Sequence, residues 1–170
     1  MKRIGNLYNK IVDLDNIERA IIQASKGKTK RKNVCDTLNN LRASALKIQD
    51  MLVNKTYKPS PYIKMTIRDG ANKKEREIFK PCFYPDQCIH WALMLQLQDA
   101  LLKKMYYWNC ASIKGRGLNH GKKHIEKILK SDKKNTKYCL KLDVRKFYPS
   151  ISKDVLKKKF QRIIKDKDTL

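Results

Sequence analysis

The fold is decided by residues 140–151, which read Leu140-Lys141-Leu142-Asp143-Val144-Arg145-Lys146-Phe147-Tyr148-Pro149-Ser150-Ile151. Apolar and polar residues alternate at the start of this run, and the alternation extends back to Tyr138. A period of two predicts a β-strand over residues 138–144, with Asp143 on the face opposite to the apolar side chains. Ser152 is a good N-cap residue, so a last helix is expected to follow.

The carboxylate of Asp143 is the first candidate for chemistry. A hard divalent cation takes oxygen ligands, and a phosphate group can share such a cation with a carboxylate. An aspartate at a strand end is also often a helix cap or an ion-pair partner, and single motifs carry a real risk of false positives. The residues by themselves leave both readings open.

The run LDVRKFYPSI resembles the first catalytic motif of bacterial reverse transcriptases. That motif has an apolar residue, Asp, an apolar residue, two variable residues, two aromatics and Pro-Ser-Ile, and every position is matched here. The resemblance implies that Asp143 binds catalytic Mg²⁺, for which Mn²⁺ can substitute, assisted by the backbone carbonyl of Val144. It also implies that Tyr148 lies under the deoxyribose and excludes a 2′-hydroxyl. Core packing is the alternative role for Phe147 and Tyr148.

Upstream of this run, the sequence predicts helices and one β-hairpin. Helices are expected over residues 12–25, 34–52, 85–106 and 119–130. The second is expected as a single helix of about five turns, because its apolar residues recur every three or four positions. Residues 62–68 and 75–80 flank the turn signal Asp69-Gly70, which predicts a hairpin. The fold class is therefore α+β.

The second hairpin segment resembles the fingers strand of the same family. It reads Glu75-Arg76-Glu77-Ile78-Phe79-Lys80-Pro81, and Arg76 matches the position that grips the incoming triphosphate. A guanidinium suits that role because its fork can bind phosphate oxygens in a bidentate manner. Lys64 and Lys74 are further candidates for nucleotide binding, together with Lys73. Any of these cations could also be an ordinary surface charge.

A glycine-containing loop precedes the helix expected at residues 119–130. It resembles the Gly-Arg-Gly loop of the family, in which glycine lets the backbone approach a template closely. The candidates for nucleic-acid contact are Lys114, Gly115, Arg116 and Gly117 in this loop, and Arg145 and Lys146 after the predicted strand. His120 and His124 lie one helical turn apart, but no third metal ligand has suitable spacing, so two histidines on a helix face are expected.

The resemblance implies a particular division of the chain. Residues 1–137 correspond to helix-rich fingers, and residues 138–170 to the first strand and helix of a right-hand polymerase palm. The Asp-Asp box, the rest of the palm and the thumb are not found in the sequence. One carboxylate cannot hold two Mg²⁺ ions, so the chain alone is expected to be inactive. A carboxyl-terminal half, an associated protein or an RNA would complete the enzyme. In pattern the chain resembles retron, diversity-generating retroelement and abortive-infection enzymes.

The charge of the chain agrees with a polyanionic partner. It has 40 Lys and Arg against 16 Asp and Glu, a formal net charge of +24. Such a surface attracts nucleic acid, so an RNA template, a DNA or RNA primer and a dNTP are the expected partners. A Lys-rich composition without binding function is the simpler alternative. Two further alternatives remain open for the function. One is a non-catalytic RNA- or DNA-binding module, and the other is a protein that binds a partner through the apolar face of the helix expected over residues 34–52.

The cysteines and the apolar segments indicate the compartment. None of the five cysteines forms a C-x-x-C pair, so neither a zinc ribbon nor a redox motif is indicated. No apolar run approaches the roughly 20 residues needed to span a bilayer. The first residues have no apolar segment typical of a signal peptide. A cytoplasmic protein with free thiols and no membrane contact is expected.

Overall fold

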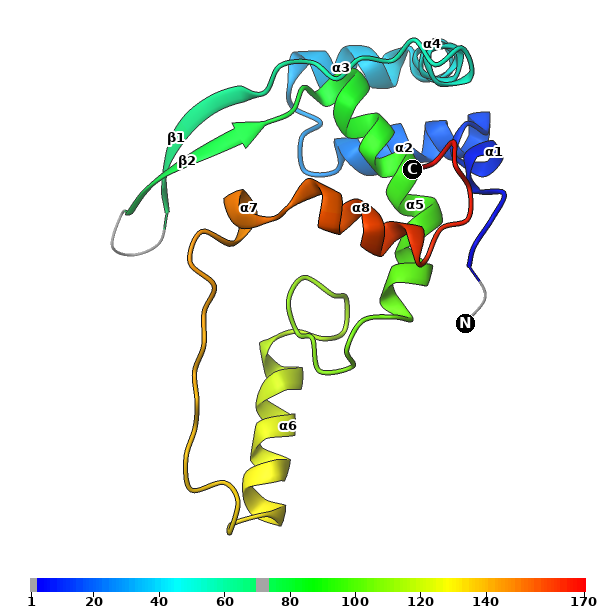
Figure 1. Cartoon of the computed structure of the whole chain (residues 1–170). Coiled ribbons are helices and arrows are strands. Elements are labelled where there is room, and N and C mark those ends of the chain that lie inside the picture. The colour runs from blue at the N-terminus through cyan, green and yellow to red at the C-terminus, as the bar shows by residue number, and fades with distance from the viewer. Residues whose placement is uncertain (1–2, 70–73) are drawn as a thin grey trace. The chain divides into compact units, whose positions relative to one another are not determined.

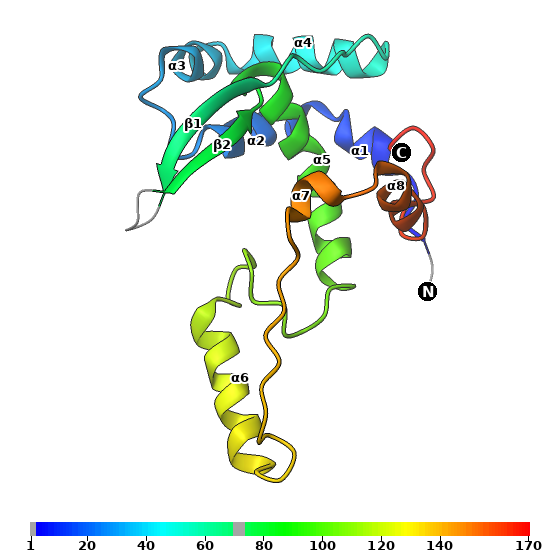
Figure 2. The same cartoon turned by 60° about the vertical axis from the view of Figure 1, so that its left-hand side comes forward.

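The computed structural model describes residues 3–69 and 74–170, except the side chains of Asp69 and Lys74. In chain order its elements are α1 (Leu7–Ile11), α2 (Leu14–Ser25), α3 (Lys32–Asn39), α4 (Leu41–Val53), β1 (Ile63–Asp69), β2 (Lys74–Lys80), η1 (Phe83–Gln87), α5 (Cys88–Leu102), α6 (Leu118–Ser131), α7 (Phe147–Ser150) and α8 (Lys153–Gln161). The chain divides into two compact units. Unit 1 comprises Met1–Gln98 and Gln161–Leu170, and unit 2 comprises Asp99–Phe160. Figures 1 and 2 show the same elements from two directions.

The core of unit 1 lies where α2 packs on α4. Ile17 and Ile21 of α2 and Ile48 of α4 are completely buried. Burying such a side chain stabilises the fold by roughly 1.5–3 kcal/mol. The helix expected over residues 12–25 is confirmed as α2, and the carboxylate of Asp13 caps its start by accepting a hydrogen bond from the backbone N–H of Asn16 at 3.2 Å.

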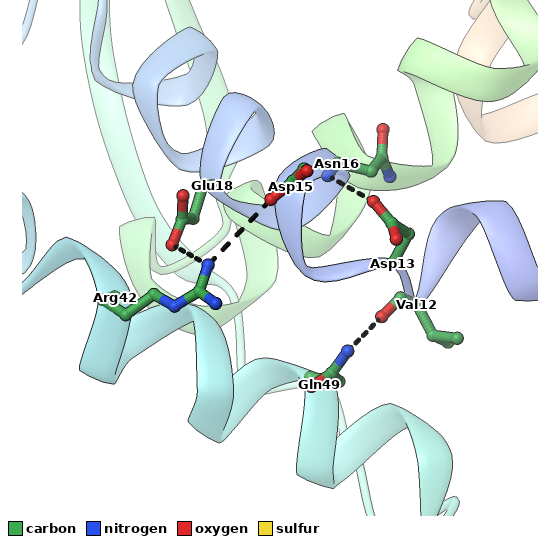
Figure 3. A network of polar contacts seen from close by, with 7 residues as sticks. All are labelled: Val12, Asp13, Asp15, Asn16, Glu18, Arg42 and Gln49. Atoms are coloured by element: carbon green, nitrogen blue, oxygen red, sulfur yellow. Dashed lines mark hydrogen bonds and ion pairs between the residues drawn. The ribbon is translucent and has the colours of Figure 1, made fainter.

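Polar contacts hold α4 against α2 and against the residue that follows α1 (Figure 3). The side-chain amide of Gln49 on α4 donates to the carbonyl of Val12 at 2.9 Å. The guanidinium of Arg42 lies 2.9 Å from Glu18 and 4.0 Å from Asp15. Because Arg42 and Asp15 are well exposed, this ion pairing contributes little, about 0.2–1 kcal/mol, and the apolar contact dominates.

A buried asparagine joins α2 to α5. The Asn16 side chain donates to the carbonyls of Ile11 and Ala92, both at 3.1 Å, and accepts from Gln96 at 2.6 Å. Each polar atom of the amide is therefore satisfied. A buried polar group with complete hydrogen bonding holds a specific arrangement, whereas an unpaired one would cost about 1–3 kcal/mol.

The single long helix predicted from Val34 to Leu52 is wrong in one respect. The structure has two helices, α3 and α4, which separate at Asn40, where φ is −116° and ψ is 40°. The side chain of Asn40 donates to the carbonyl of Asp36 at 3.1 Å. Asparagine competes in this way with helical backbone hydrogen bonds, which is why the helix breaks there. Val34 before the break and Ala45, Ile48 and Leu52 after it are nevertheless buried.

The predicted hairpin is confirmed. Strands β1 and β2 pair antiparallel, with Ile63 opposite Lys80 and Ile67 opposite Arg76. The predicted turn at Asp69-Gly70 extends outside the described residues. The hairpin contains two strands and exposes large side chains such as Met65 and Phe79.

The helix predicted over residues 85–106 forms in two parts, η1 and α5, and ends earlier than expected. Its last hydrogen bonds shorten to an i−3 pattern, in which the N–H of Lys104 donates to the carbonyl of Leu101. This tightening is common at helix ends. No helix in the described part of the chain is long and apolar enough to cross a membrane.

Unit 2 contains α6, which confirms the helix expected at residues 119–130, and the two short helices α7 and α8. The Ser152 hydroxyl accepts from the N–H of Val155 at 3.4 Å, so the predicted N-cap of α8 is also confirmed. None of residues 99–160, all of which the structure describes, is buried. Unit 2 therefore has no core of its own.

The strand predicted over residues 138–144 is wrong for this chain. The segment has no helix, strand or bridge assignment, and within the described residues no other strand pairs with it. Leu140 is 82% exposed, Leu142 80% and Val144 59%. The alternating pattern is that of a strand, but a strand needs a neighbour to receive its backbone hydrogen bonds. The strand that the resemblance implies for residues 138–144 is therefore not formed in this structure.

The carboxyl-terminal residues of unit 1 return to its amino-terminal helix. The N–H of Ile4 donates to the carbonyl of Ile163 at 2.8 Å, and the N–H of Lys165 donates to the carbonyl of Ile4 at 2.7 Å. The carboxylate of Asp166 accepts from the N–H of Tyr8 at 2.7 Å. This bond occupies a free N–H in the first turn of α1, and it lowers the pKa of Asp166 below its usual value.

Candidate functional site

Asp143 lies in the unpaired extended segment of unit 2. Its side chain is exposed, and it makes no ion pair or side-chain hydrogen bond within the residues that the structure describes. Val144 beside it is also exposed. The carboxylate is therefore available to solvent, and neither an apolar pocket nor a helix encloses it.

The residues after Asp143 form a tight turn and the short helix α7. Lys146 has a left-handed backbone with φ 49°, and its carbonyl accepts from the N–H of Ser150 at 3.1 Å. The rings of Phe147 and Tyr148 meet edge to face at 5.3 Å between centroids. Both rings are exposed, so the core-packing alternative has no support in this structure. Arg145 and Lys146, candidates for nucleic-acid contact, are exposed beside them.

The residues of this segment do not by themselves fit a resident pair of Mg²⁺ ions. Mg²⁺ requires a nearly octahedral set of oxygen ligands, and Asp143 with the carbonyl of Val144 could offer only two or three. Across residues 3–69 and 74–170, no three His, Cys, Asp or Glu side chains are grouped so that they could hold a metal ion. Any such site would require carboxylates from another segment.

Two of the predicted nucleotide-binding residues, Arg76 and Lys64, lie on opposite faces of the hairpin. Side chains alternate along a strand, and paired residues in an antiparallel ladder share a face. Arg76 therefore shares a face with its partner Ile67, whereas Lys64 lies on the other face with its partner Phe79. Lys64 also forms an exposed ion pair with Glu77 at 2.8 Å. The Lys74 side chain and all of Lys73 lie outside the described residues.

The glycine-containing loop has the conformation that glycine permits. Gly115 has φ +79°, a left-handed value that other residues rarely adopt. The Arg116 guanidinium lies over the Tyr107 ring at 4.9 Å and donates to the Tyr107 carbonyl at 3.3 Å. Lys114 is exposed, and Gly117 is the residue that precedes α6. Lys114 is therefore exposed to solvent in this loop, whereas the contacts of Arg116 with Tyr107 stabilise the loop conformation.

An aromatic cluster at the start of α6 was not predicted from the sequence. The Trp108 ring stacks on His124, with centroids 3.2 Å apart and an interplanar angle of 11°. His120 lies 5.2 Å from the same ring and 5.4 Å from Tyr107. The two histidines one turn apart, with aromatic residues upstream, were the available signal. Their role is to hold the loop against α6, which agrees with the interpretation as helix-face histidines.

Unit 1 contains no activated nucleophile among its described buried groups. Burial raises the pKa of the Cys88 thiol to about 12, so it stays protonated at neutral pH. Burial, with a hydrogen bond from its hydroxyl to Asp86 at 2.8 Å, also raises the pKa of Tyr57. These groups stabilise the fold and do not offer nucleophilic chemistry.

The positive charge is concentrated in unit 2. Residues 99–160 carry 18 Lys and Arg against 5 Asp and Glu, a net charge of +13 in 62 residues. The remaining 108 residues carry 22 against 11, a net charge of +11. Charge at this density attracts polyanions and binding would weaken with salt.

Comparisons with known proteins do not add to this picture. No protein-family model matches the chain, and no curated protein matches it. The interpretation of the site therefore rests on the residues of this chain and on their geometry.

Proposed function

We propose that this chain is the amino-terminal part of an RNA-directed DNA polymerase, a reverse transcriptase. The observation that carries the proposal is the state of residues 140–144, where an exposed carboxylate lies between apolar side chains and no strand of the described residues pairs with the segment. A strand with an exposed apolar face needs the remainder of a sheet to cover it. The sequence of the same segment resembles the first catalytic motif of these polymerases.

In this proposal each candidate residue has a defined task. Asp143 and the carbonyl of Val144 contribute to a Mg²⁺ site, in which the ions stabilise the entering and leaving oxygens of phosphoryl transfer. Arg76 binds the triphosphate of the incoming dNTP. Lys64 lies on the other face of the hairpin and pairs with Glu77, so the two cations are not expected to bind the same phosphate group. Lys114, Arg145 and Lys146 contact the phosphate backbone of the template or primer.

The chain alone is proposed to be inactive. A two-metal site needs several carboxylates at fixed positions, and Asp143 supplies one. The remaining carboxylates would come from a further palm segment, in the same polypeptide or in a partner, whose strands pair with residues 138–144. That pairing would cover Leu140 and Leu142 and would fix the direction of the Asp143 side chain.

The experiment starts from the transcript downstream of codon 170. We expect an Asp-Asp box there, in frame or in an adjacent gene. The polypeptide that carries it is produced together with this chain and assayed for primer extension on an RNA template with a DNA primer, dNTPs and Mg²⁺. Extension is expected for the pair and not for this chain alone, and Asp143→Asn should abolish extension while leaving template binding intact. Primer extension by the isolated chain would refute its proposed inactivity. Full extension by the two polypeptides when this chain carries Asp143→Asn would refute the metal role of Asp143.

The exposed Tyr148 allows a second test in the completed polymerase. Its ring is proposed to contact the deoxyribose, where a 2′-hydroxyl would clash. Tyr148→Ala should therefore increase the use of ribonucleotides relative to deoxyribonucleotides, measured as the ratio of kcat/KM for the two, while Tyr148→Phe should leave it unchanged. An unaltered ratio in Tyr148→Ala would remove the residue from sugar selection.

A non-catalytic RNA- or DNA-binding module is the second candidate. The net charge of +13 on unit 2 favours it. Both candidates bind nucleic acid with strong salt dependence. Only the polymerase requires a further segment that supplies carboxylates. An Asp-Asp box encoded downstream of codon 170 would therefore distinguish the polymerase from the binding module.

A further inference from the structure

Helix α6 carries a row of lysines that none of the roles above uses. Lys123, Lys127 and Lys130 follow one another at spacings of four and three residues, which places them on one side of the helix. With Glu126 and Ser131 they line a shallow depression of about 450 Å³. At a rise of 1.5 Å per residue, the row is about 11 Å long.

The lysine row occupies a side of α6 that is distinct from the sides of the histidines and of the exposed apolar residues. His120 and His124 project toward Trp108 and occupy the adjacent side. The exposed apolar residues Leu118, Ile125 and Leu129 lie on roughly the opposite side, since successive residues turn by about 100°. The lysines therefore form a surface separate from the apolar stripe.

The lysines of the row form no ion pair with a carboxylate in the part of the chain that the structure describes. Glu126 lines the same depression, but its carboxylate pairs with Lys122 at 3.8 Å, so the three lysines keep an excess of positive charge. Three ammonium groups within about 11 Å repel one another, and an anionic ligand would relieve that repulsion.

We infer that this lysine row binds the phosphate backbone of a nucleic-acid strand, at a place distinct from the glycine-containing loop and from the Asp143 segment. The inference deepens the proposed function, because it takes the same polyanion as ligand. A strand presents one phosphate per roughly 3.4 Å of helix axis, so a row of about 11 Å spans about three phosphates. Lysines act as point charges, so the contact is independent of base sequence.

An anionic membrane is the competing ligand for a basic amphipathic helix. A helix that lies in a membrane interface buries its apolar side in the lipid. If Leu118, Ile125 and Leu129 were buried in that way, the lysine row on roughly the opposite side would point away from the headgroups. The arrangement of side chains on α6 therefore favours nucleic acid.

The test compares two triple variants of the full chain that lose the same charge. Lys123→Gln, Lys127→Gln and Lys130→Gln remove the row, and Lys10→Gln, Lys47→Gln and Lys165→Gln remove three exposed lysines of unit 1. Glutamine keeps good helix propensity, which circular dichroism verifies. The probe is a fluorescent 20-nucleotide oligouridylate, whose binding is followed by anisotropy between about 50 and 200 mM KCl.

We expect the slope of log K against log salt to decrease in magnitude by about 2 for the row variant, because each lost phosphate contact on a single strand contributes about 0.7. The unit 1 variant should keep the wild-type slope. Equal slopes for the two variants would overturn the inference while leaving nucleic-acid binding, and with it the proposed function, in place. No binding by the wild-type chain would count against both.

A parallel titration with phosphatidylcholine vesicles containing phosphatidylserine covers the membrane alternative. The row is expected to have no effect on vesicle binding. If the row variant loses vesicle binding and keeps the wild-type salt slope with oligouridylate, the ligand is a lipid surface and the inference is wrong.

Discussion

The two units of this chain differ in where they place their apolar side chains. In unit 1 Ile17 and Ile21 of α2 and Ile48 of α4 are completely buried, and a fully bonded asparagine connects α2 to α5. In unit 2 no residue between Asp99 and Phe160 is buried, and Leu140 and Leu142 are about four-fifths exposed. Unit 1 thus has the internal contacts that stabilise a fold, whereas unit 2 has surfaces that would gain stability from a partner.

The difference in charge agrees with the difference in packing. Unit 2 has the higher density of positive charge, and mutual repulsion opposes compaction of a charged segment. A polyanion would reduce that repulsion, and a neighbouring strand would cover the apolar face of residues 138–144. Unit 1 is thus stabilised by its own core, and the function proposed above assigns the binding of a polyanion to unit 2.

Thiol reactivity provides the largest expected contrast between the units. Cys88 of unit 1 is buried with a pKa of about 12, whereas Cys139 of unit 2 is exposed. Burial shields the Cys88 thiol from reagents, and its raised pKa leaves very little thiolate at neutral pH. A maleimide applied to the native chain should therefore label the exposed Cys139 faster than Cys88 by orders of magnitude, measured by mass spectrometry of the peptides. Similar rates would mean that unit 1 opens as readily as unit 2, and 6 M urea should remove the contrast by exposing both thiols.

Truncating one isoleucine in each unit tests the packing directly. Ile17→Ala in α2 removes a completely buried side chain and should lower the free energy of unfolding by about 2–5 kcal/mol, from lost burial and the cavity left behind. Ile125→Ala in α6 is the matched control, because its side chain is 59% exposed, and it should change stability by no more than about 0.5 kcal/mol. Urea unfolding followed by circular dichroism measures both. A cost for Ile125→Ala as large as that for Ile17→Ala would show that unit 2 has a core after all.

A pair of asparagines extends the comparison to polar groups. Asn16→Ala leaves the Ala92 carbonyl and the Gln96 amide without partners in the interior and should cost about 1–3 kcal/mol. In unit 2, Asn135 donates to Asp132 at 3.0 Å on an exposed turn, where water can replace it. Asn135→Ala should therefore have little effect on the same urea unfolding curve. The comparison would be contradicted if the two substitutions cost the same.

The sequence predicted those elements whose stability comes from local pattern. The sequence located α2 and α6, the spacing of apolar residues located the stripe of α3 and α4, and the alternation around Asp69-Gly70 located the hairpin. The break at Asn40 was missed because the periodic stripe continues through it, while the side chain of one residue decides the backbone there. These outcomes follow from contacts within about four residues or across one turn.

The candidate site was harder to predict because it depends on contacts beyond the local pattern. Residues 138–144 have the alternation of a strand, but strand formation requires a neighbour, which no local pattern can guarantee. The stacking of Trp108 on His124 depends on how the loop folds back onto α6. The roles assigned to Asp143, Arg76 and Tyr148 rest on resemblance and stay predictions.

The smallest expected effect concerns the carboxylate that joins the two ends of unit 1. The N–H of Tyr8 lowers the pKa of Asp166, so its ionised form is favoured in the folded chain. A lowered folded-state pKa gives stability that is fully present above the ordinary value of 3.8 and is lost as the pH falls through the lower, folded-state value. Because the group is only partly buried, we expect Asp166→Ala to cost roughly 0.5–1 kcal/mol at pH 7. The difference from wild type should shrink as the pH falls below 3.8.

Thermal unfolding at several pH values measures this difference, with Asp132→Ala as the matched control. Asp132 accepts from the N–H of Asn135 at 3.1 Å on the exposed turn of unit 2. Since unit 2 has no core to lose, the control should leave the transition of unit 1 unchanged at every pH. A deficit for Asp166→Ala that stayed constant down to the lowest pH would mean that the side chain stabilises by packing and not through its charge. The closure of unit 1 by its carboxyl-terminal residues would then depend on the buried Ile164 and on the backbone bonds of Ile4.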